Sequence, residues 1–310
     1  MKTSDPVVIT CALTGGMTVP TQSKAIPLTV SDIVRQGVEA VAAGASVLHV
    51  HVRDEATGRP VADQELFHKV FIALSAETDA VLQPTTGGGR GMTVAERGSV
   101  LQFSPEMATL NAGSMNFGIY PVAARDLPFE EWEREYLEGT KDYIFKNTFS
   151  DITYLAELMK RNGTIPEIEI YDVGQIFNIR RLIDEGAIVP PFNLQFVLGV
   201  LGGNQAEPDQ LIHMLRTSER TLRDIDFSWS AAGVGYRGEF GVAAMALALG
   251  GNIRVGLEDN LRVRKDKEAF SNAELVTKAA AMADYFDRRP ATPAEARVLL
   301  HLKGADKIDI

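Results

Sequence analysis

Short apolar segments rich in β-branched residues alternate along this chain with longer amphipathic segments, and the pattern occurs eight times. Repetition of this kind is typical of βα units, in which helices cover the faces of a parallel sheet. Eight units predict an α/β fold, the (β/α)8 TIM barrel. An open doubly wound sheet is the alternative, because periodicity does not show whether a sheet closes. The expected strands are residues 7–13, 47–52, 80–83, 107–110, 167–171, 192–198, 226–230 and 252–255.

Two additions to the barrel are expected. The chain has 310 residues, more than the ~250 residues of a typical barrel, and we expect one domain over residues 1–310. Residues 126–147, after the fourth strand, begin with an aromatic and acidic segment and predict an insertion. It is interpreted as a lid, an oligomer contact or a plain surface loop. Beyond the eighth unit, Pro290, Pro293 and the residues up to Leu299 predict an extra C-terminal helix.

Charge and composition exclude several classes of protein. The formal net charge is −10, from 41 acidic and 31 basic residues, which disfavours binding to nucleic acid. No segment approaches the ~20 apolar residues of a transmembrane helix, so no membrane partner is expected. The single cysteine, Cys11, cannot form an intrachain disulfide and is expected to be a small buried residue. These features favour a cytoplasmic protein.

The second expected strand carries His49 and His51 near its carboxyl end. Side chains two residues apart on a strand point to the same face, so the two imidazoles project together. In a TIM barrel the chemistry occurs at the carboxyl ends of the strands. Zinc accepts neutral imidazole nitrogen and keeps an open position in catalytic sites, so the pair predicts a metal site. The alternative is a pair of buried histidines that bind backbone groups.

The end of the eighth strand offers the third ligand and its neighbours. Glu258 and Asp259 point in different directions, which suits a zinc ligand and a base, respectively. Arg254 on the same strand has the planar donors that hold a carboxylate or phosphate. Helix capping and solvation are the alternative for the two acids. The other three histidines are expected in helices or in the C-terminal tail: His68, His213 and His301.

Two further strand ends are candidates for substrate binding. After the third strand, Thr85, Thr86 and Gly87 begin a glycine-rich turn whose amides and hydroxyls can hold an anion. The turn lacks the Gly-Lys-Ser/Thr ending of a phosphate-binding loop, and a turn without a ligand is the alternative. After the fourth strand, Asn111 and Ser114 offer neutral hydrogen bonds.

The fifth strand alternates carboxylates with isoleucines. Glu167 and Glu169 share one face of this strand. Carboxylates are rarely buried without partners, so a place inside the barrel implies a role in the site.

Six segments spread over nearly the whole chain form a specific combination. They are residues 9–16 (ITCALTGG), 49–54 (HVHVRD), 83–88 (QPTTGG), 110–117 (LNAGSMNF), 250–260 (GGNIRVGLEDN) and 291–297 (ATPAEAR). Together they resemble the β-keto acid cleavage enzymes, a family of zinc-dependent barrels.

The resemblance implies roles for residues that occupy the motif positions. The implied zinc ligands are His49, His51 and Glu258. The implied catalytic residues are Arg254, Asp259 and Glu169. Thr85 stands where the family often has serine and is implied in substrate binding, with Asn111 and Ser114 in a matching loop. The adjacent acids Glu258 and Asp259 could also have the opposite roles, with Asp259 as the zinc ligand and Glu258 as the base.

The resemblance also implies a reaction. A β-keto acid and acetyl-CoA give acetoacetate and a new CoA thioester by retro-Claisen cleavage. Zinc would polarise the substrate oxygens as a Lewis acid, and Asp259, oriented by Arg254, would move a proton. A homo-oligomer is implied as well, commonly a tetramer.

One departure from the family concerns the substrate. Members that act on amino-substituted keto acids carry a carboxylate in the loop after the first strand. Residues 14–30 of this chain contain neither Asp nor Glu. We therefore expect a substrate with a neutral or anionic side group, and Lys24 would favour an anionic one if it pointed inward.

Two other functions compete with this interpretation. A zinc hydrolase of the amidohydrolase kind also places His-x-His on a barrel strand, but it needs further histidines at later strand ends. A non-catalytic ligand-binding barrel is the other alternative, and the polar residues at the strand ends argue against it.

Overall fold

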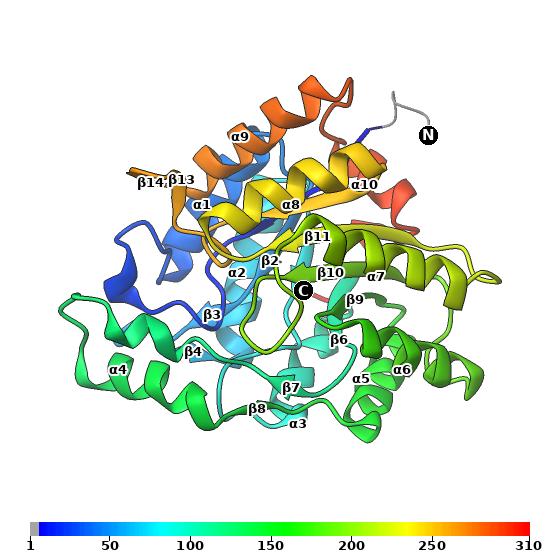
Figure 1. The fold of residues 1–310 in the computed structure, drawn as a ribbon, viewed down its shortest axis with the longest axis horizontal. Helices are drawn as coiled ribbons and strands as arrows, with labels where there is room; N and C mark the ends of the chain where they lie inside the picture. The colour runs from blue at the N-terminus through cyan, green and yellow to red at the C-terminus, as the bar shows by residue number, and fades with distance from the viewer. Residues whose placement is uncertain (1–5) are drawn as a thin grey trace.

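Eight parallel strands form the centre of the computed structural model, which describes residues 6–310 (Figure 1). The strands are β1 (Ile9–Ala12), β2 (Val47–Val50), β5 (Val81–Pro84), β6 (Met107–Asn111), β9 (Ile165–Ile170), β10 (Asn193–Leu198), β11 (Ser228–Gly233) and β12 (Asn252–Val255). Their hydrogen-bonded order is β5-β2-β1-β12-β11-β10-β9-β6. The two end strands, β5 and β6, lie against each other. Thr86 joins them: its hydroxyl donates to the Thr109 carbonyl at 2.6 Å, and its N–H donates to the Thr109 hydroxyl at 3.1 Å. The predicted TIM barrel is confirmed.

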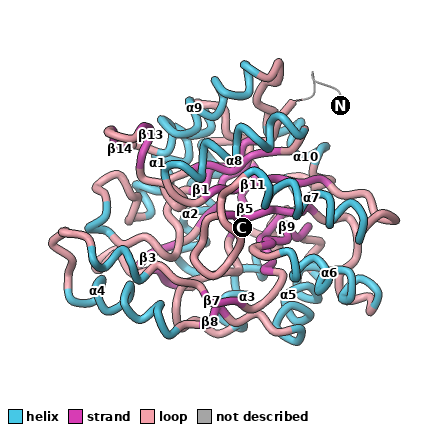
Figure 2. The backbone as a smooth tube through the Cα atoms, in the orientation of Figure 1, coloured by secondary structure: helices cyan, strands magenta, loops and turns pink. Residues whose placement is uncertain are grey.

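Helices surround the strands on the outside, as Figure 2 shows. They are α1 (Val30–Ala42), α2 (Gln64–Glu77), α3 (Val94–Gly98), α5 (Phe149–Arg161), α6 (Val173–Asp184), α7 (Pro208–Thr221), α8 (Tyr236–Leu249) and α9 (Asn272–Tyr285). Local sequence fixes their ends. The Thr29 side chain accepts the Asp32 N–H at the start of α1, and Gly44, with φ +118°, follows its end. The main apolar core lies between the strands and these helices and includes Cys11, which is fully buried.

The amino end of the barrel is closed by the extra helix that the sequence predicts, α10 (Pro293–Leu299). An apolar cluster joins this helix region to the first residues of the strands: Val8, Val47, Val81, Met107, Ala291, Ala296 and Leu300. Arg297 of α10 forms an ion pair with Glu106, which is fully buried, at 2.8 Å. The barrel interior is therefore closed at this end.

The insertion lies at the opposite, carboxyl end, and in the structure it covers residues 115–145 rather than the expected 126–147. It consists of β7 (Met115–Asn116), the 3₁₀ turns η3 (Tyr120–Ala124) and η4 (Gly139–Asp142), helix α4 (Glu131–Glu138) and β8 (Ile144–Phe145), which pairs with β7. Tyr136 donates its hydroxyl to the Gly16 carbonyl at 2.7 Å, and Glu133 accepts the Thr21 hydroxyl. The insertion is thus held against the loop after β1.

Small elements complete the chain. Two hairpins extend from the barrel, β3 (Val52–Arg53) with β4 (Pro60–Val61) and β13 (Arg262–Arg264) with β14 (Lys267–Glu268). Single 3₁₀ turns are η1 (Pro20–Gln22), η2 (Ser99–Phe103) and η5 (Ala305–Lys307). Among residues 6–310, no helix has the length and apolar character needed to cross a membrane.

Candidate active site and metal centre

A cavity of about 450 Å³ lies at the carboxyl end of the barrel. Its polar side is formed by His49, His51, Arg254 and Glu258. Its other walls come from the insertion and from the segments that follow β10, β11 and β12: Phe117, Ile119, Tyr143, Phe145, Val200, Leu201, Tyr236 and Leu261. A polar cluster beside an apolar wall is typical of a small-molecule site.

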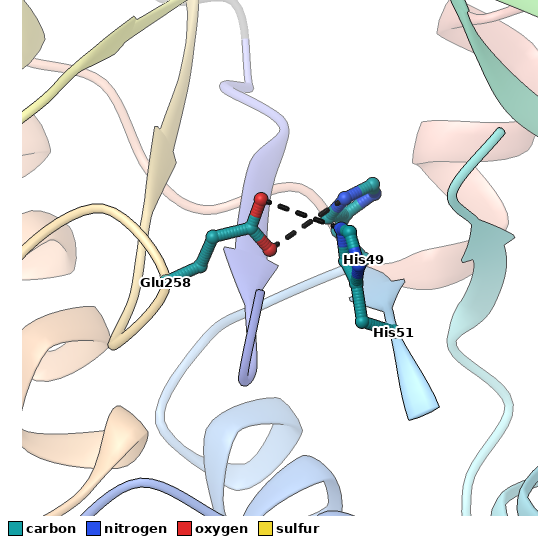
Figure 3. A group of neighbouring side chains, drawn as sticks. All are labelled: His49, His51 and Glu258. Carbon is teal, nitrogen blue, oxygen red and sulfur yellow. Dashed lines mark ion pairs between the residues drawn. The ribbon is translucent and has the colours of Figure 1, made fainter. Parts of the chain in front are cut away.

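The two histidines and one glutamate meet at this end, as Figure 3 shows. His49 lies within β2, His51 follows the same strand, and Glu258 follows β12. One nitrogen of each histidine and one oxygen of Glu258 lie within 4.8 Å of one another. His49 Nε2 is 3.6 Å from Glu258 Oε2, and His51 Nε2 is 3.5 Å from Glu258 Oε1. Both histidines are buried, and Glu258 is partly exposed toward the cavity.

The protonation of this cluster fits a bound cation. His49 Nδ1 lies 3.0 Å from Gln83 Oε1, which can only accept, so the ring proton is on Nδ1 and Nε2 carries a lone pair. Burial lowers the pKa of His49 to about 3, which keeps the ring neutral. Glu258 Oε2, opposite this lone pair, has no hydrogen-bond partner among the described residues. A lone pair and a carboxylate oxygen repel unless a cation lies between them, and zinc accepts this donor set.

Glycines allow Glu258 to reach the histidines. Gly256 has φ +149°, and a Cβ there would lie 2.2 Å from the Ala12 carbonyl oxygen. A Cβ on Gly15 would lie 2.5 Å from Glu258 Cγ. Glu239 of α8 holds the loop that carries Glu258, because its carboxylate accepts the Gly256 N–H at 2.8 Å and the Asn260 amide at 2.8 Å.

Arg254 connects the acidic groups of the site. Its Nε and Nη2 donate to the two oxygens of Asp259 at 2.8 and 2.9 Å, a bidentate pair. Nη2 also donates to Glu258 at 2.7 Å, and Nη1 donates to Glu169 at 3.2 Å.

The charges in this cluster follow from burial and from Arg254. Burial alone would lower the pKa of Arg254, but Asp259 and Glu258 raise it well above its usual range, so the guanidinium stays charged. Burial raises the pKa of Asp259, although Arg254 opposes the shift, and burial raises the pKa of Glu169 to about 8. Burial would also raise the pKa of Glu258, but Arg254 and the histidines hold it well below its usual range.

A hydrogen-bonded chain across the barrel interior links His49 to Arg254. Gln83 bonds His49 through its oxygen and donates its amide N–H to Glu167 at 2.7 Å. Gln195 donates to the same Glu167 oxygen at 3.0 Å and accepts from Arg254 at 3.1 Å. Glu167 is therefore the centre of the chain, and it fixes the orientation of the Gln83 amide. The sequence analysis proposed a role for Glu167 but none for Gln83 or Gln195. The two glutamines are polar residues within apolar strands, and this is the signal that could have identified them.

The candidate substrate-binding residues do not all reach the cavity. Thr85 and Gly87 line it, and the Thr85 hydroxyl accepts the Gly87 N–H at 2.9 Å. Thr86 faces β6 instead, in the contact that joins the end strands. Asn111 is buried behind the cavity wall, and neither atom of its amide has a hydrogen-bond partner among residues 6–310. Ser114 is exposed outside the cavity and accepts the Asn147 N–H.

The loop after β1 is held by a buried arginine of β3, Arg53, to which the sequence analysis assigned no role. Arg53 is almost fully buried and donates to the Thr14, Gly15 and Thr18 carbonyls at 2.8, 2.8 and 3.0 Å. It fixes this loop beside Glu258. Lys24, on the same loop, is exposed and does not line the cavity.

Fold and site together define a TIM-barrel protein with a buried His-His-Glu cluster at the carboxyl ends of its strands, beside an arginine–carboxylate group. The sequence model of one family, described as beta-keto acid cleavage enzyme, matches residues 6–302. The chain belongs to this family, and it is an enzyme. The resemblance inferred from the sequence motifs is confirmed.

Curated relatives extend over the full length of the chain. The 3,5-dioxohexanoate:acetyl-CoA acetone transferase of Paraburkholderia graminis is 43% identical over 308 residues, which cover 98% of both chains. The 3-keto-5-aminohexanoate cleavage enzyme of Acetoanaerobium sticklandii is 37% identical and covers 96% of this chain and 98% of its own. Among solved structures, the apo structure of ObcA matches with a TM-score of 0.69 at 18% identity, over 90% of this chain and 66% of that one. At this identity the match shows a similar fold only.

Proposed function

We propose that this enzyme transfers the acyl group of a β-keto acid to CoA, with zinc held by His49, His51 and Glu258. The bond between the keto carbon and C2 of the substrate breaks, and C2 with its carboxylate forms a bond to the acetyl carbon of acetyl-CoA. The products are acetoacetate and a new acyl-CoA. The observation that carries the proposal is the pairing of a neutral His49 lone pair with an unpartnered Glu258 oxygen, next to a carboxylate that can accept a proton.

Zinc in this position supplies Lewis-acid polarisation of the substrate oxygens. Asp259 accepts the proton from C2 of the keto acid, because burial raises its proton affinity while the bidentate contact with Arg254 fixes its direction. Arg254 keeps its charge through the reaction and balances the acids around it.

Thr85 is proposed to bind the substrate carboxylate. Its hydroxyl oxygen accepts N–H bonds from Gly87 at 2.9 Å and Gly88 at 3.4 Å, so its hydrogen is directed elsewhere and the threonine lines the cavity. A hydroxyl held in this way donates to an anionic oxygen without reorganising. Glu169 is proposed to keep Arg254 in place from the opposite side.

The cavity favours a substrate with a neutral side group. The carboxylates that line it are Glu169, Glu258 and Asp259; Arg254 binds all three, and the remaining Glu258 oxygen is assigned to zinc, so none is left to pair with an ammonium group. The rest of the wall is mainly apolar, with Arg125 and Arg262 as its other charged residues, and Lys24 is exposed and does not line it. The relative named for 3,5-dioxohexanoate takes a substrate with an uncharged side group, which agrees with this choice.

The test uses purified zinc-loaded enzyme, acetyl-CoA and a panel of β-keto acids with neutral, anionic and cationic side groups. We expect acetoacetate and the matching acyl-CoA, detected by mass spectrometry, with the highest kcat/KM for a neutral side group. His49→Ala should abolish turnover, and His213→Ala, on helix α7, is the matched control that should not. Release of free acid without acyl-CoA would support a hydrolase instead, and comparable rates for cationic and neutral substrates would contradict the side-group assignment.

A further inference from the structure

A second hollow lies beside the mouth of the catalytic cavity. It has a volume of about 320 Å³ and is lined by Tyr236, Arg237, Phe240, Lys265 and Lys278. Tyr236 lines the catalytic cavity as well, so the two spaces adjoin at this ring. We name this hollow, with the neighbouring Arg264, the basic groove.

The basic groove concentrates positive charge on an acidic protein. The hairpin β13–β14 contributes four cations within residues 262–268 of a chain whose net charge is −10. Two of them are neutralised locally, because Lys267 pairs with Glu274 and Arg262 lies 3.9 Å from Glu268. The others on this surface form no ion pair with any carboxylate of residues 6–310: Arg237, Arg264 and Lys265.

The floor of the groove is rigid. Lys278 Nζ lies 3.6 Å from the centre of the Phe240 ring and donates to the Val263 carbonyl at 2.6 Å. These two contacts anchor the hairpin to α8 and α9 and leave a further positive charge in the lining. Tyr236 is half-buried and presents an aromatic ring at the edge. Cations beside an aromatic ring suit a phosphorylated nucleoside.

The other side of the mouth has an excess of acidic residues, although Arg125 lines the cavity there. Helix α4 of the insertion and its N-cap carry four glutamates outside the core, Glu130, Glu131, Glu135 and Glu138, besides the buried Glu133. Figure 1 shows α4 well apart from β13 and β14. A polyanion near the mouth is therefore repelled from one side and attracted to the other.

We propose that the basic groove binds the phosphorylated nucleoside end of the CoA thioester, with Arg237, Arg264 and Lys265 contacting its phosphates. This inference rests on the proposed function, since it assigns a place to the part of acetyl-CoA that does not react. The thioester arm passes Tyr236 into the catalytic cavity, and the phosphates stay outside in the groove.

The test compares acetyl-CoA with acetyl-pantetheine, a thioester that lacks the nucleotide. The variant is the double charge reversal Arg264→Glu/Lys265→Glu. We expect its KM for acetyl-CoA to rise about tenfold or more at low salt with kcat unchanged, and its KM for acetyl-pantetheine to stay the same, because charge-assisted phosphate contacts are lost and chemistry is not. The matched control is Arg223→Glu, between α7 and β11 at the amino end of the barrel, which should change neither KM.

Direct binding separates this inference from the proposed function. Calorimetric titration with adenosine 3′,5′-bisphosphate should show binding to the wild type and the Arg223→Glu control and at least tenfold weaker binding to the double variant. That result supports the groove even if no keto acid is turned over. Equal acetyl-CoA KM values in the double variant and the wild type would overturn the assignment. So would a KM increase in Arg125→Glu, on the insertion side of the cavity, without one in the double variant.

Discussion

Replacing Gln83 with leucine tests how the barrel interior prepares His49 for a metal. Gln83 is fully buried, accepts from His49 Nδ1 at 3.0 Å and donates to Glu167 at 2.7 Å. Leucine has a similar volume but neither group. The ring proton of His49 then has no acceptor at Nδ1, so the tautomer that leaves Nε2 open loses its advantage.

The expected loss is a factor of about 10 to 100 in zinc affinity, the usual effect of removing the hydrogen-bond partner of a metal-binding histidine. This corresponds to about 1.4 to 2.7 kcal/mol. The same variant leaves the His49 N–H without a partner in a buried site, which costs about 1 to 3 kcal/mol of folding stability, while the Glu167 oxygen keeps the bond from Gln195. Zinc affinity and stability should therefore fall together.

The assay is competition for zinc against a chromophoric chelator at fixed pH, combined with thermal unfolding of the metal-free protein. Gln195→Leu is the matched control, because Gln195 also bonds Glu167 but contacts no histidine. It should lower stability and leave zinc affinity within about threefold. Unchanged zinc affinity in Gln83→Leu, or an equal loss in both variants, would refute the role assigned to Gln83.

Three other variants test separate parts of the structure. Glu258→Gln should lose bound zinc after gel filtration, measured by metal analysis, because the amide carries no charge; a full zinc content would contradict its assignment as a ligand. Arg297→Ala should lower the free energy of unfolding in urea by about 3 kcal/mol, since buried Glu106 loses its cationic partner and keeps only the Gly304 N–H, and kcat should persist because α10 is at the other end of the barrel. Burial raises the pKa of Glu239 to about 8 from 4.5, so the folded protein holds a proton there that the unfolded chain releases, and stability falls as pH rises through this interval. Between pH 4.5 and 8, the melting temperature of metal-free Glu239→Gln should fall less steeply with rising pH than that of the wild type. Identical slopes would show that Glu239 does not cause the pH dependence of stability.

The local pattern of apolar and polar residues was sufficient to predict the fold, because each βα unit has its own hydrophobic periodicity. Strand positions were less accurate at their ends: the seventh strand was expected at 226–230 and is Ser228–Gly233. Polar residues that face the interior, such as Ser230, interrupt the apolar run and shift the expected boundary. Strand ends depend on neighbouring strands, which local sequence does not describe.

Candidate site residues on a single strand were easier to predict than contacts between strands. The spacing of His49 and His51 fixes their common face, and the structure brings Glu258 to them. The bonds from Glu167 to Gln83 and Gln195 join residues 84 and 28 positions apart, so they exist only once the barrel is closed. Ser114 was predicted to bind substrate, but the turn after β6 directs its side chain outward. No local feature of the sequence indicates that direction.

The closure of the barrel by α10 has a consequence for kinetics. With the amino end filled by Ala296, Leu300 and the strand residues around them, reactants and products reach and leave the cavity at the other end. A small keto acid that must lie deep, beside His49, cannot pass a bulky thioester that already fills the mouth. Addition should therefore be compulsory, with the keto acid first and the thioester second, and acyl-CoA should leave before acetoacetate.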